Sequence, residues 1–189
     1  MRGLIAIFSF AILVSACGSG TAETKETVGT EVEASAEENA GSFAEDTKTI
    51  ESTCLAMLDA FSTKKGTPPD WARLNNLCAE SAQFNSVTHY EEAEMHQHTL
   101  KSYEEDEGEW YDNNDVMEIQ LGLTVDRFHN VANAFQAYQL DYDNHDGEAG
   151  SEKGVLFYQL AFVGDRWYVT NLMWQSESEG IEVGEELIN

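Results

Sequence analysis

The chain has 189 residues, which is enough for one domain of medium size with short extensions. Hydrophobic residues make up 42% of it, sufficient for a single core. The 35 acidic residues outnumber 10 Lys and Arg and give a net charge of −25, which excludes electrostatic attraction to nucleic acid or to anionic lipid headgroups.

Residues 1–16 are typical of a secretory signal peptide, because an Arg precedes an apolar run too short to remain as a membrane-spanning helix. The stretch Val14-Ser15-Ala16-Cys17 resembles the bacterial lipobox, in which cleavage precedes a Cys that receives lipid such as palmitate. An ordinary signal cut near Ala16 is the alternative. No acidic residue directly follows Cys17, so we expect a lipoprotein of the bacterial cell envelope, at the outer membrane facing the periplasm, with its lipid anchor as the only membrane contact.

Residues 17–47 are rich in Ser, Thr, Ala, Gly and Glu. Such a composition cannot bury enough apolar surface to offset the entropy lost on folding, so it predicts a disordered acidic tether. The folded domain is expected over residues 48–178, followed by a polar C-terminal tail over residues 179–189.

Two helices are predicted at the start of the domain, over residues 48–62 and 70–80, each with an apolar stripe at helical spacing. Asp70 is placed where a carboxylate favours a helix N-terminus. Cys54 and Cys78 fall on the inward stripes, and an envelope protein meets an oxidising environment, so we predict a disulfide worth about 3.5 kcal/mol. Two separate buried thiols are the alternative.

A short strand is predicted over residues 82–87, and a third, acidic helix after it. Thr88 and Glu91 have the spacing of a capping box, which starts this helix, and it continues to about Glu107. A loop over residues 108–114 then carries Trp110.

Three histidines lie around the third helix, namely His89, His96 and His98. His96 and His98 are two positions apart and would point to different faces of a helix. Without a third ligand at a suitable spacing, the sequence predicts no metal site.

The next two segments are predicted strands. From Met117 to Arg127 apolar and polar residues alternate, which predicts that Met117 and the odd positions after it face the core while Glu118 and Asp126 face outward. Arg127 ends this inward series, so we expect its side chain to be enclosed. A second strand follows over residues 130–142 and carries Tyr138.

Residues 154–177 predict two long strands joined at Gly164-Asp165, a two-residue loop typical of tight hairpins. Such a loop fixes the register, and it pairs four residues of each strand across the core face. The predicted pairs are Phe162 with Trp167, Leu160 with Val169, Tyr158 with Asn171, and Leu156 with Met173.

The opposite face of the hairpin carries Tyr168, Leu172 and Trp174. This face has too many large apolar groups for open water, so we expect a homodimer that pairs through it.

The order of elements resembles the nuclear transport factor 2-like superfamily, the SnoaL-like cone fold, and most sharply a bacterial group within it whose role is unassigned. The resemblance is carried by Pro69-Asp70-Trp71, by Asp126-Arg127-Phe128 and by Asp165-Arg166-Trp167 at the hairpin turn. It implies an α+β fold, with a cone-like curved antiparallel sheet packed on about three N-terminal helices. Members include polyketide cyclases, ketosteroid isomerase, dehydratases and plain binding domains, so the fold does not imply a function.

The predicted ligand site consists of Arg127, Tyr158, Asn171, Tyr138 and Trp110. An enclosed cation near a phenol and an amide suits a small ligand with a carboxylate or carbonyl and an apolar body. An internal partner for Arg127 is the alternative.

No carboxylate is assigned to the core face, and no catalytic triad, phosphate-binding loop or CxxC motif is found, so no cofactor and no catalytic residue are predicted. These observations favour a ligand-binding or accessory domain. The alternatives are an isomerase, lyase or cyclase like the catalytic relatives, and a structural module that dimerises.

Overall fold

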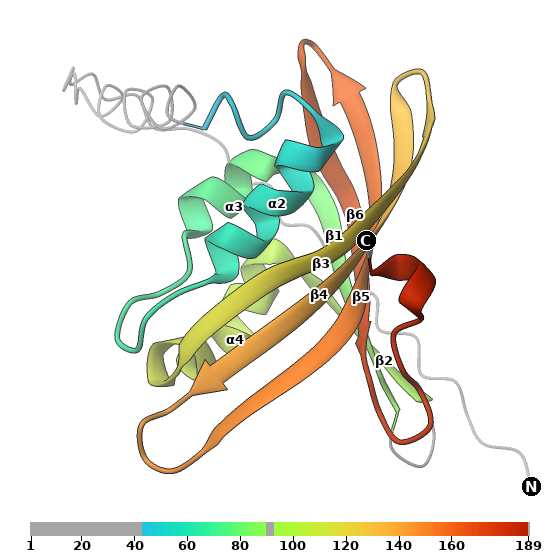
Figure 1. The fold of residues 1–189 in the computed structure, drawn as a ribbon. Helices are drawn as coiled ribbons and strands as arrows, with labels where there is room; N and C mark the ends of the chain where they lie inside the picture. Colours follow the sequence, from blue (N-terminus) through green and yellow to red (C-terminus); the bar gives the residue numbers. More distant parts are fainter. Residues whose placement is uncertain (1–42, 90–92, 189) are drawn as a thin grey trace, which may run out of the picture.

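The computed structural model describes residues 43–89 and 93–188 (Figure 1). The predicted signal peptide, Cys17 and most of the predicted tether lie outside these residues. Residues 43–47 belong to the domain, since Thr47 is buried and its carbonyl accepts a hydrogen bond from the Trp167 N–H over 2.8 Å. No helix within the described ranges is long and apolar enough to cross a membrane.

The first two helices form as predicted, with shorter bounds. Helix α2, Ile50–Phe61, starts at a capping box in which the Thr49 and Ser52 side chains each bond to the other residue's backbone N–H. Helix α3, Trp71–Leu77, starts at Asp70, whose carboxylate accepts from the Arg73 N–H over 2.9 Å. Helix α3 ends three residues earlier than predicted, because residues from Cys78 onward join the sheet.

The predicted third helix is wrong in its first half. Strand β1 spans Cys78–His89, and strand β2, Ala93–Thr99, pairs with it antiparallel. Helix α4, Leu100–Asn113, begins only after β2, at a capping box formed by Thr99 and Ser102, and it continues through the predicted loop that carries Trp110. Thr88 does not cap a helix, because it lies in β1 and pairs with Glu94 of β2. Strand pairing satisfies the backbone groups that a helix would have used.

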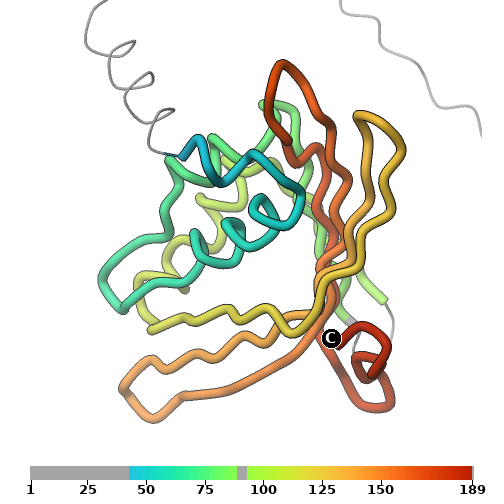
Figure 2. Tube along the Cα trace, turned by 45° about the horizontal axis from the view of Figure 1, so that its top comes forward, coloured from blue at the N-terminus to red at the C-terminus, as the bar shows by residue number. Residues whose placement is uncertain are grey.

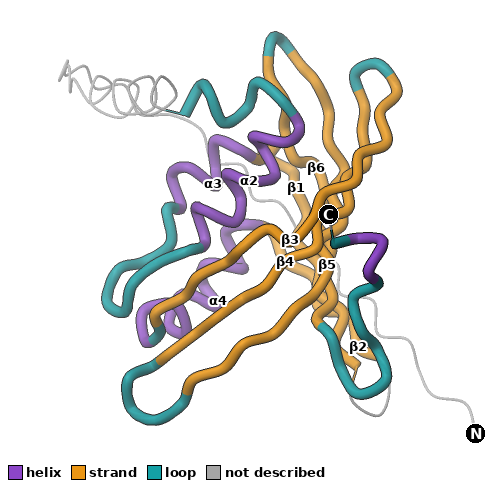
Figure 3. Tube along the Cα trace, in the orientation of Figure 1, coloured by secondary structure: helices purple, strands orange, loops and turns teal. Residues whose placement is uncertain are grey.

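The sheet has six strands in the order β2-β1-β6-β5-β4-β3. The four strands after β2 are β3 (Asp115–Phe128), β4 (Val131–Asp143), β5 (Ala149–Val163) and β6 (Arg166–Ser176), and a short 3-10 helix, η1 (Glu185–Leu187), follows them. All neighbours are antiparallel except β1 and β6, which are parallel. Helices α2, α3 and α4 lie together on one side of the curved, unclosed sheet (Figures 1 and 3). Figure 2 shows the same helices within the curve of the sheet. The predicted α+β cone fold is therefore confirmed.

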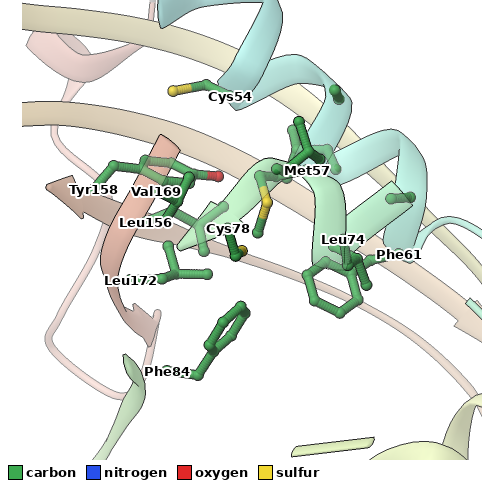
Figure 4. Packing of buried hydrophobic residues seen from close by; sticks show 14 of the residues in the cluster. Cys54, Met57, Phe61, Leu74, Cys78, Phe84, Leu156, Tyr158, Val169 and Leu172 are labelled. Carbon is green, nitrogen blue, oxygen red and sulfur yellow. The ribbon is translucent and has the colours of Figure 1, made fainter. Parts of the chain in front are cut away.

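The core lies between these helices and the concave face of the sheet. Figure 4 shows Met57 and Phe61 of α2 and Leu74 of α3 in one cluster with Val169 and Leu172 of β6. Trp167 is the largest of the fully buried side chains.

The predicted disulfide is wrong, because Cys54 and Cys78 are both free, buried thiols (Figure 4). The prediction assumed that both residues lie on facing helix stripes. Cys78 instead begins β1, where it pairs with Val169 of β6. Burial raises the pKa of each thiol to about 12, so both cysteines are inert.

Two β-bulges change which residues face the core. In β3 the register shifts between Gln120 and Gly122, so Val116 is buried while Met117 is 50% exposed, the reverse of the prediction. In β6 the register shifts after Val169, which turns Asn171 to the convex face and brings Leu172 inward. The hairpin pairs nearest the turn keep the predicted register.

Candidate functional site: a cavity inside the cone

A cavity of about 320 Å³ lies between helices α2 and α4 and the concave face of the sheet. Its apolar border includes Met57, Leu58, Leu140, Leu156 and Leu172. Nine aromatic residues also border it: Phe61, Phe84, Tyr103, Trp110, Tyr111, Tyr138, Tyr142, Tyr158 and Trp174.

Two of the tyrosines, both on β4, lie opposite glycines of the neighbouring strand β5. Tyr138 pairs with Gly154, and Tyr142 pairs with Gly150. A Cβ atom at Gly154 would lie 2.6 Å from the Tyr138 hydroxyl oxygen, and one at Gly150 would lie 2.5 Å from the Tyr142 hydroxyl oxygen. The absence of side chains at these positions allows both rings to lie against the strand and form the cavity wall.

Tyr158 is held by a chain of hydrogen bonds. Its hydroxyl donates to Gln136 Oε1 over 2.7 Å, and Gln136 Nε2 donates to Gln120 Oε1 over 2.8 Å. Desolvation raises the pKa of the Tyr158 phenol well above its usual 10. Asn171, the predicted partner of Tyr158, instead accepts a hydrogen bond from Asn85 Nδ2 over 2.9 Å on the convex face.

A second set of hydroxyls leads to the rim of the cavity. The Tyr138 hydroxyl lies 3.0 Å from Ser176 Oγ, which donates to Glu152 Oε1 over 3.1 Å. The Tyr103 and Tyr111 hydroxyl oxygens are 3.4 Å apart. Desolvation raises the pKa of all three tyrosines above the usual 10, so they are neutral phenols at physiological pH.

Glu118 borders the cavity, although the sequence predicted that it would face outward. The bulge between Gln120 and Gly122 reverses the faces of β3 before it, so Glu118 lies opposite Leu140 on the concave side. Its backbone N–H donates to Ser62 Oγ at the end of α2 over 2.9 Å. The side chain is half-buried, and its carboxyl oxygens are open to the cavity.

The Glu118 carboxyl group has no hydrogen-bond donor within residues 43–89 and 93–188. Burial, and secondarily the negative charge of Glu152, raise its pKa from the usual 4.5 to about 8. A carboxyl group with such a pKa in a cavity is a common feature of functional sites.

The structure brings together three of the five predicted site residues, because Tyr138, Tyr158 and Trp110 all border the cavity. Arg127 and Asn171 do not. Arg127 keeps the inward register, but it lies near the end of β3 and is exposed, with its guanidinium 4.8 Å from the Trp167 ring centre and its Nε donating to the His129 carbonyl. The predicted enclosed cation is therefore wrong.

Sequence reasoning missed the three carboxylates that border the cavity, namely Glu107, Glu118 and Glu152. One signal was present for Glu118. An isolated glycine in a strand pattern, here Gly122, often marks a bulge, and a bulge reverses the alternation on which the inward assignment depended.

The predicted dimer face is also changed by the bulge in β6. Leu172 and Trp174 border the cavity and are not on the convex face. The Arg166 guanidinium lies 4.5 Å from the ring centre of Tyr168. This ring therefore packs against a charged group and does not form part of a continuous apolar surface. The convex face carries Phe135 and Phe157 instead, with ring centres 5.2 Å apart.

A second, more polar hollow of about 580 Å³ adjoins the cavity and shares Tyr103, Glu107, Glu152 and Trp174 with it. His96 and His98 border it from β2, and His98 Nδ1 lies 3.1 Å from Asp106 Oδ2. In the part of the chain that the structure describes, no three His, Cys, Asp or Glu side chains are placed to hold a metal ion.

An open cone of antiparallel sheet, with helices over its concave face and a cavity between them, defines a known class of small domains. No protein-family model matches the sequence. No curated protein matches it either.

Solved structures match over most of the chain. A nuclear transport factor 2-like superfamily protein from Salmonella enterica serovar Typhimurium has a TM-score of 0.53 at 10% identity, covering 78% of this chain and 95% of that one. A proposed dehydratase of the same family from Streptomyces avermitilis has a TM-score of 0.52 at 11% identity, covering 71% and 98%. A proposed aromatic ring hydroxylase from Novosphingobium aromaticivorans has a TM-score of 0.51 at 17% identity, covering 70% and 89%. The chain has the fold of the nuclear transport factor 2-like superfamily.

Proposed function

We propose that the domain binds a small, partly apolar molecule inside the cone. The observation that carries this proposal is the aromatic cavity of about 320 Å³. A structural module would be expected to fill this space with side chains, because protein interiors are close-packed. Cavities of about 300 to 1,000 Å³ with an apolar border and a few polar groups are typical of ligand sites.

The test uses adamantanol, a compact neutral molecule whose cage suits a cavity of about 320 Å³. We expect calorimetry to give a Kd in the range of about 10 to 100 µM. Leu156→Trp places a large ring in the cavity and should weaken binding at least about tenfold. Leu55→Trp is the matched control, because Leu55 is 47% exposed and lies outside the cavity. Equal binding to wild type and Leu156→Trp would place the adamantanol site elsewhere and contradict the proposal.

The catalytic alternative has one point in its favour, since Glu118 is a carboxyl group inside the cone with a pKa raised to about 8. Its surroundings favour binding. Tyr158 and Tyr138 direct their hydroxyls to Gln136 and Ser176, and no tyrosine hydroxyl among the described residues bonds to Glu118. An isomerase or lyase would need a donor beside the acid to stabilise charge that develops on its substrate.

We further propose that this domain belongs to a lipoprotein of the cell envelope that is anchored through Cys17. The support is the sequence Val14-Ser15-Ala16-Cys17 after an apolar run. Metabolic labelling with a palmitate analogue should mark the wild-type protein and leave Cys17→Ala unmarked. Equal labelling of the two proteins would rule out a lipid at Cys17.

A further inference from the structure

All the ionisable side chains with a formal charge that border the cavity among the described residues are acidic. Its three carboxylates come from three elements, Glu107 from α4, Glu118 from β3 and Glu152 from β5. No Lys, Arg or His is among the described residues that border it, and none of the three carboxylates forms an ion pair within the described chain. An anionic ligand would therefore meet repulsion without a compensating cation.

The adjoining hollow is also bordered mainly by acidic side chains. It adds Asp106 and Glu177 to the carboxylates that it shares with the cavity. Among the described residues, the basic side chains that border it are His96 and His98, and His98 already faces Asp106. A positively charged molecule that passes through this hollow would be attracted at each step.

The carboxyl group of Glu118 has no cation or hydrogen-bond donor beside it among the described residues, and a ligand could supply one. This carboxyl group faces the cavity and receives no hydrogen bond from the described residues. Buried carboxylates are normally paired or hydrogen-bonded, and an unpaired one takes up a proton instead, as its pKa of about 8 indicates. A cation beside Glu118 would stabilise the ionised form and displace this proton.

Aromatic rings complete the cavity border around these acids. Trp110 packs on Tyr142 with ring centres 5.8 Å apart, and Tyr103 packs on Trp174 at 5.6 Å. Both pairs meet edge to face, an arrangement that aromatic rings favour. Rings of this kind attract cations through their faces, and sites for substituted ammonium groups are commonly built from them.

We propose that the cavity binds molecules that carry a positively charged nitrogen on an apolar body, and that Glu118 is the carboxylate that pairs with this nitrogen. The inference rests on the proposed function, because it names the ligand class for the same cavity. It reverses the expectation from the sequence, in which an enclosed Arg127 would have selected an anionic or carbonyl group.

The test compares three molecules that share one apolar cage and differ in charge, namely aminoadamantane, adamantanol and adamantane carboxylate. With the purified full-length protein near pH 7, calorimetry should show aminoadamantane binding at least about tenfold more tightly than adamantanol. The carboxylate should show no measurable binding. Aminoadamantane binding should also release close to one proton, because Glu118 is mostly protonated before the cation arrives. Titrations in two buffers with different heats of ionisation give this number.

Glu118→Gln should lower the affinity for aminoadamantane about tenfold, to that of adamantanol, and abolish the proton release. Binding of adamantanol, which has no charge to pair with Glu118, should change much less than binding of aminoadamantane. Asp126→Asn is the matched control, because it removes an exposed carboxylate from the same strand and should alter neither molecule's affinity. Glu118→Asp keeps the carboxylate and should retain the preference for the amine, which separates a loss of charge from a loss of fold.

The outcomes are distinct. Equal affinities of wild type for aminoadamantane and adamantanol would overturn the inference and leave the proposed binding function standing. Tighter binding of the carboxylate would overturn it as well. Binding of none of the three would contradict both proposals.

Discussion

Raising the pH from about 5 to about 9 should destabilise this protein through Glu118, by about 3 kcal/mol. The pKa of its carboxyl group is raised from the usual 4.5 to about 8, so between these values the folded chain holds a proton that the unfolded chain has lost. The free energy of unfolding therefore falls as the pH rises through this window. The full shift corresponds to at most about 5 kcal/mol, and contact with solvent in the cavity reduces it.

The measurement is a series of thermal melts of wild type and Glu118→Gln across this pH range. At acidic pH the two proteins should be nearly equal, because a protonated Glu resembles Gln. At alkaline pH the variant should melt about 8 °C higher. Asp126→Asn removes an exposed charge from the same strand and should follow the wild-type curve. Parallel curves for wild type and Glu118→Gln would show that the carboxyl group is solvated like a surface acid.

Gly154→Ala should cost about 3 kcal/mol of folding stability and weaken binding of adamantanol. The added Cβ would lie 2.6 Å from the Gln175 carbonyl oxygen and 2.6 Å from the Tyr138 hydroxyl oxygen. Tyr138 can rotate away, but the carbonyl belongs to the backbone of β6 beside Val155 of β5. The strands must therefore separate locally, and the cavity wall formed by Tyr138 moves with them.

Two other glycines provide controls for this melt. The three atoms nearest to a Cβ at Gly150 all belong to the side chain of Tyr142, which can move, so Gly150→Ala should cost less although the cavity changes. Gly108→Ala lies in α4 with no atom within 4 Å of the new Cβ, and should be neutral or stabilising by up to about 1 kcal/mol. If Gly154→Ala has the same melting temperature as Gly108→Ala, the close approach of β5 and β6 does not exclude a side chain at position 154.

The sequence by itself determined the parts of the fold that depend on neighbouring residues. The Gly164-Asp165 loop predicted a hairpin, and Val163 and Arg166 pair at its ends with Gly164 at a φ of +71°. Phe162 with Trp167 and Leu160 with Val169 follow in the predicted register, because a two-residue turn fixes the pairs next to it. The periodic stripe over α2 and the carboxylate cap of α3 were equally local and equally predictable.

Only the tertiary structure decided what lies inside the cone. The bulge in β6 separates Tyr158 from Asn171, and the bulge in β3 brings Glu118 to the concave face. A bulge moves every later side chain to the opposite face, so an alternation read from one end of a strand fails beyond it. Arg127 shows a second limit. Its side of the sheet was predictable from alternation, but its exposure was not, because the segments that cover this side of the sheet come from distant parts of the chain.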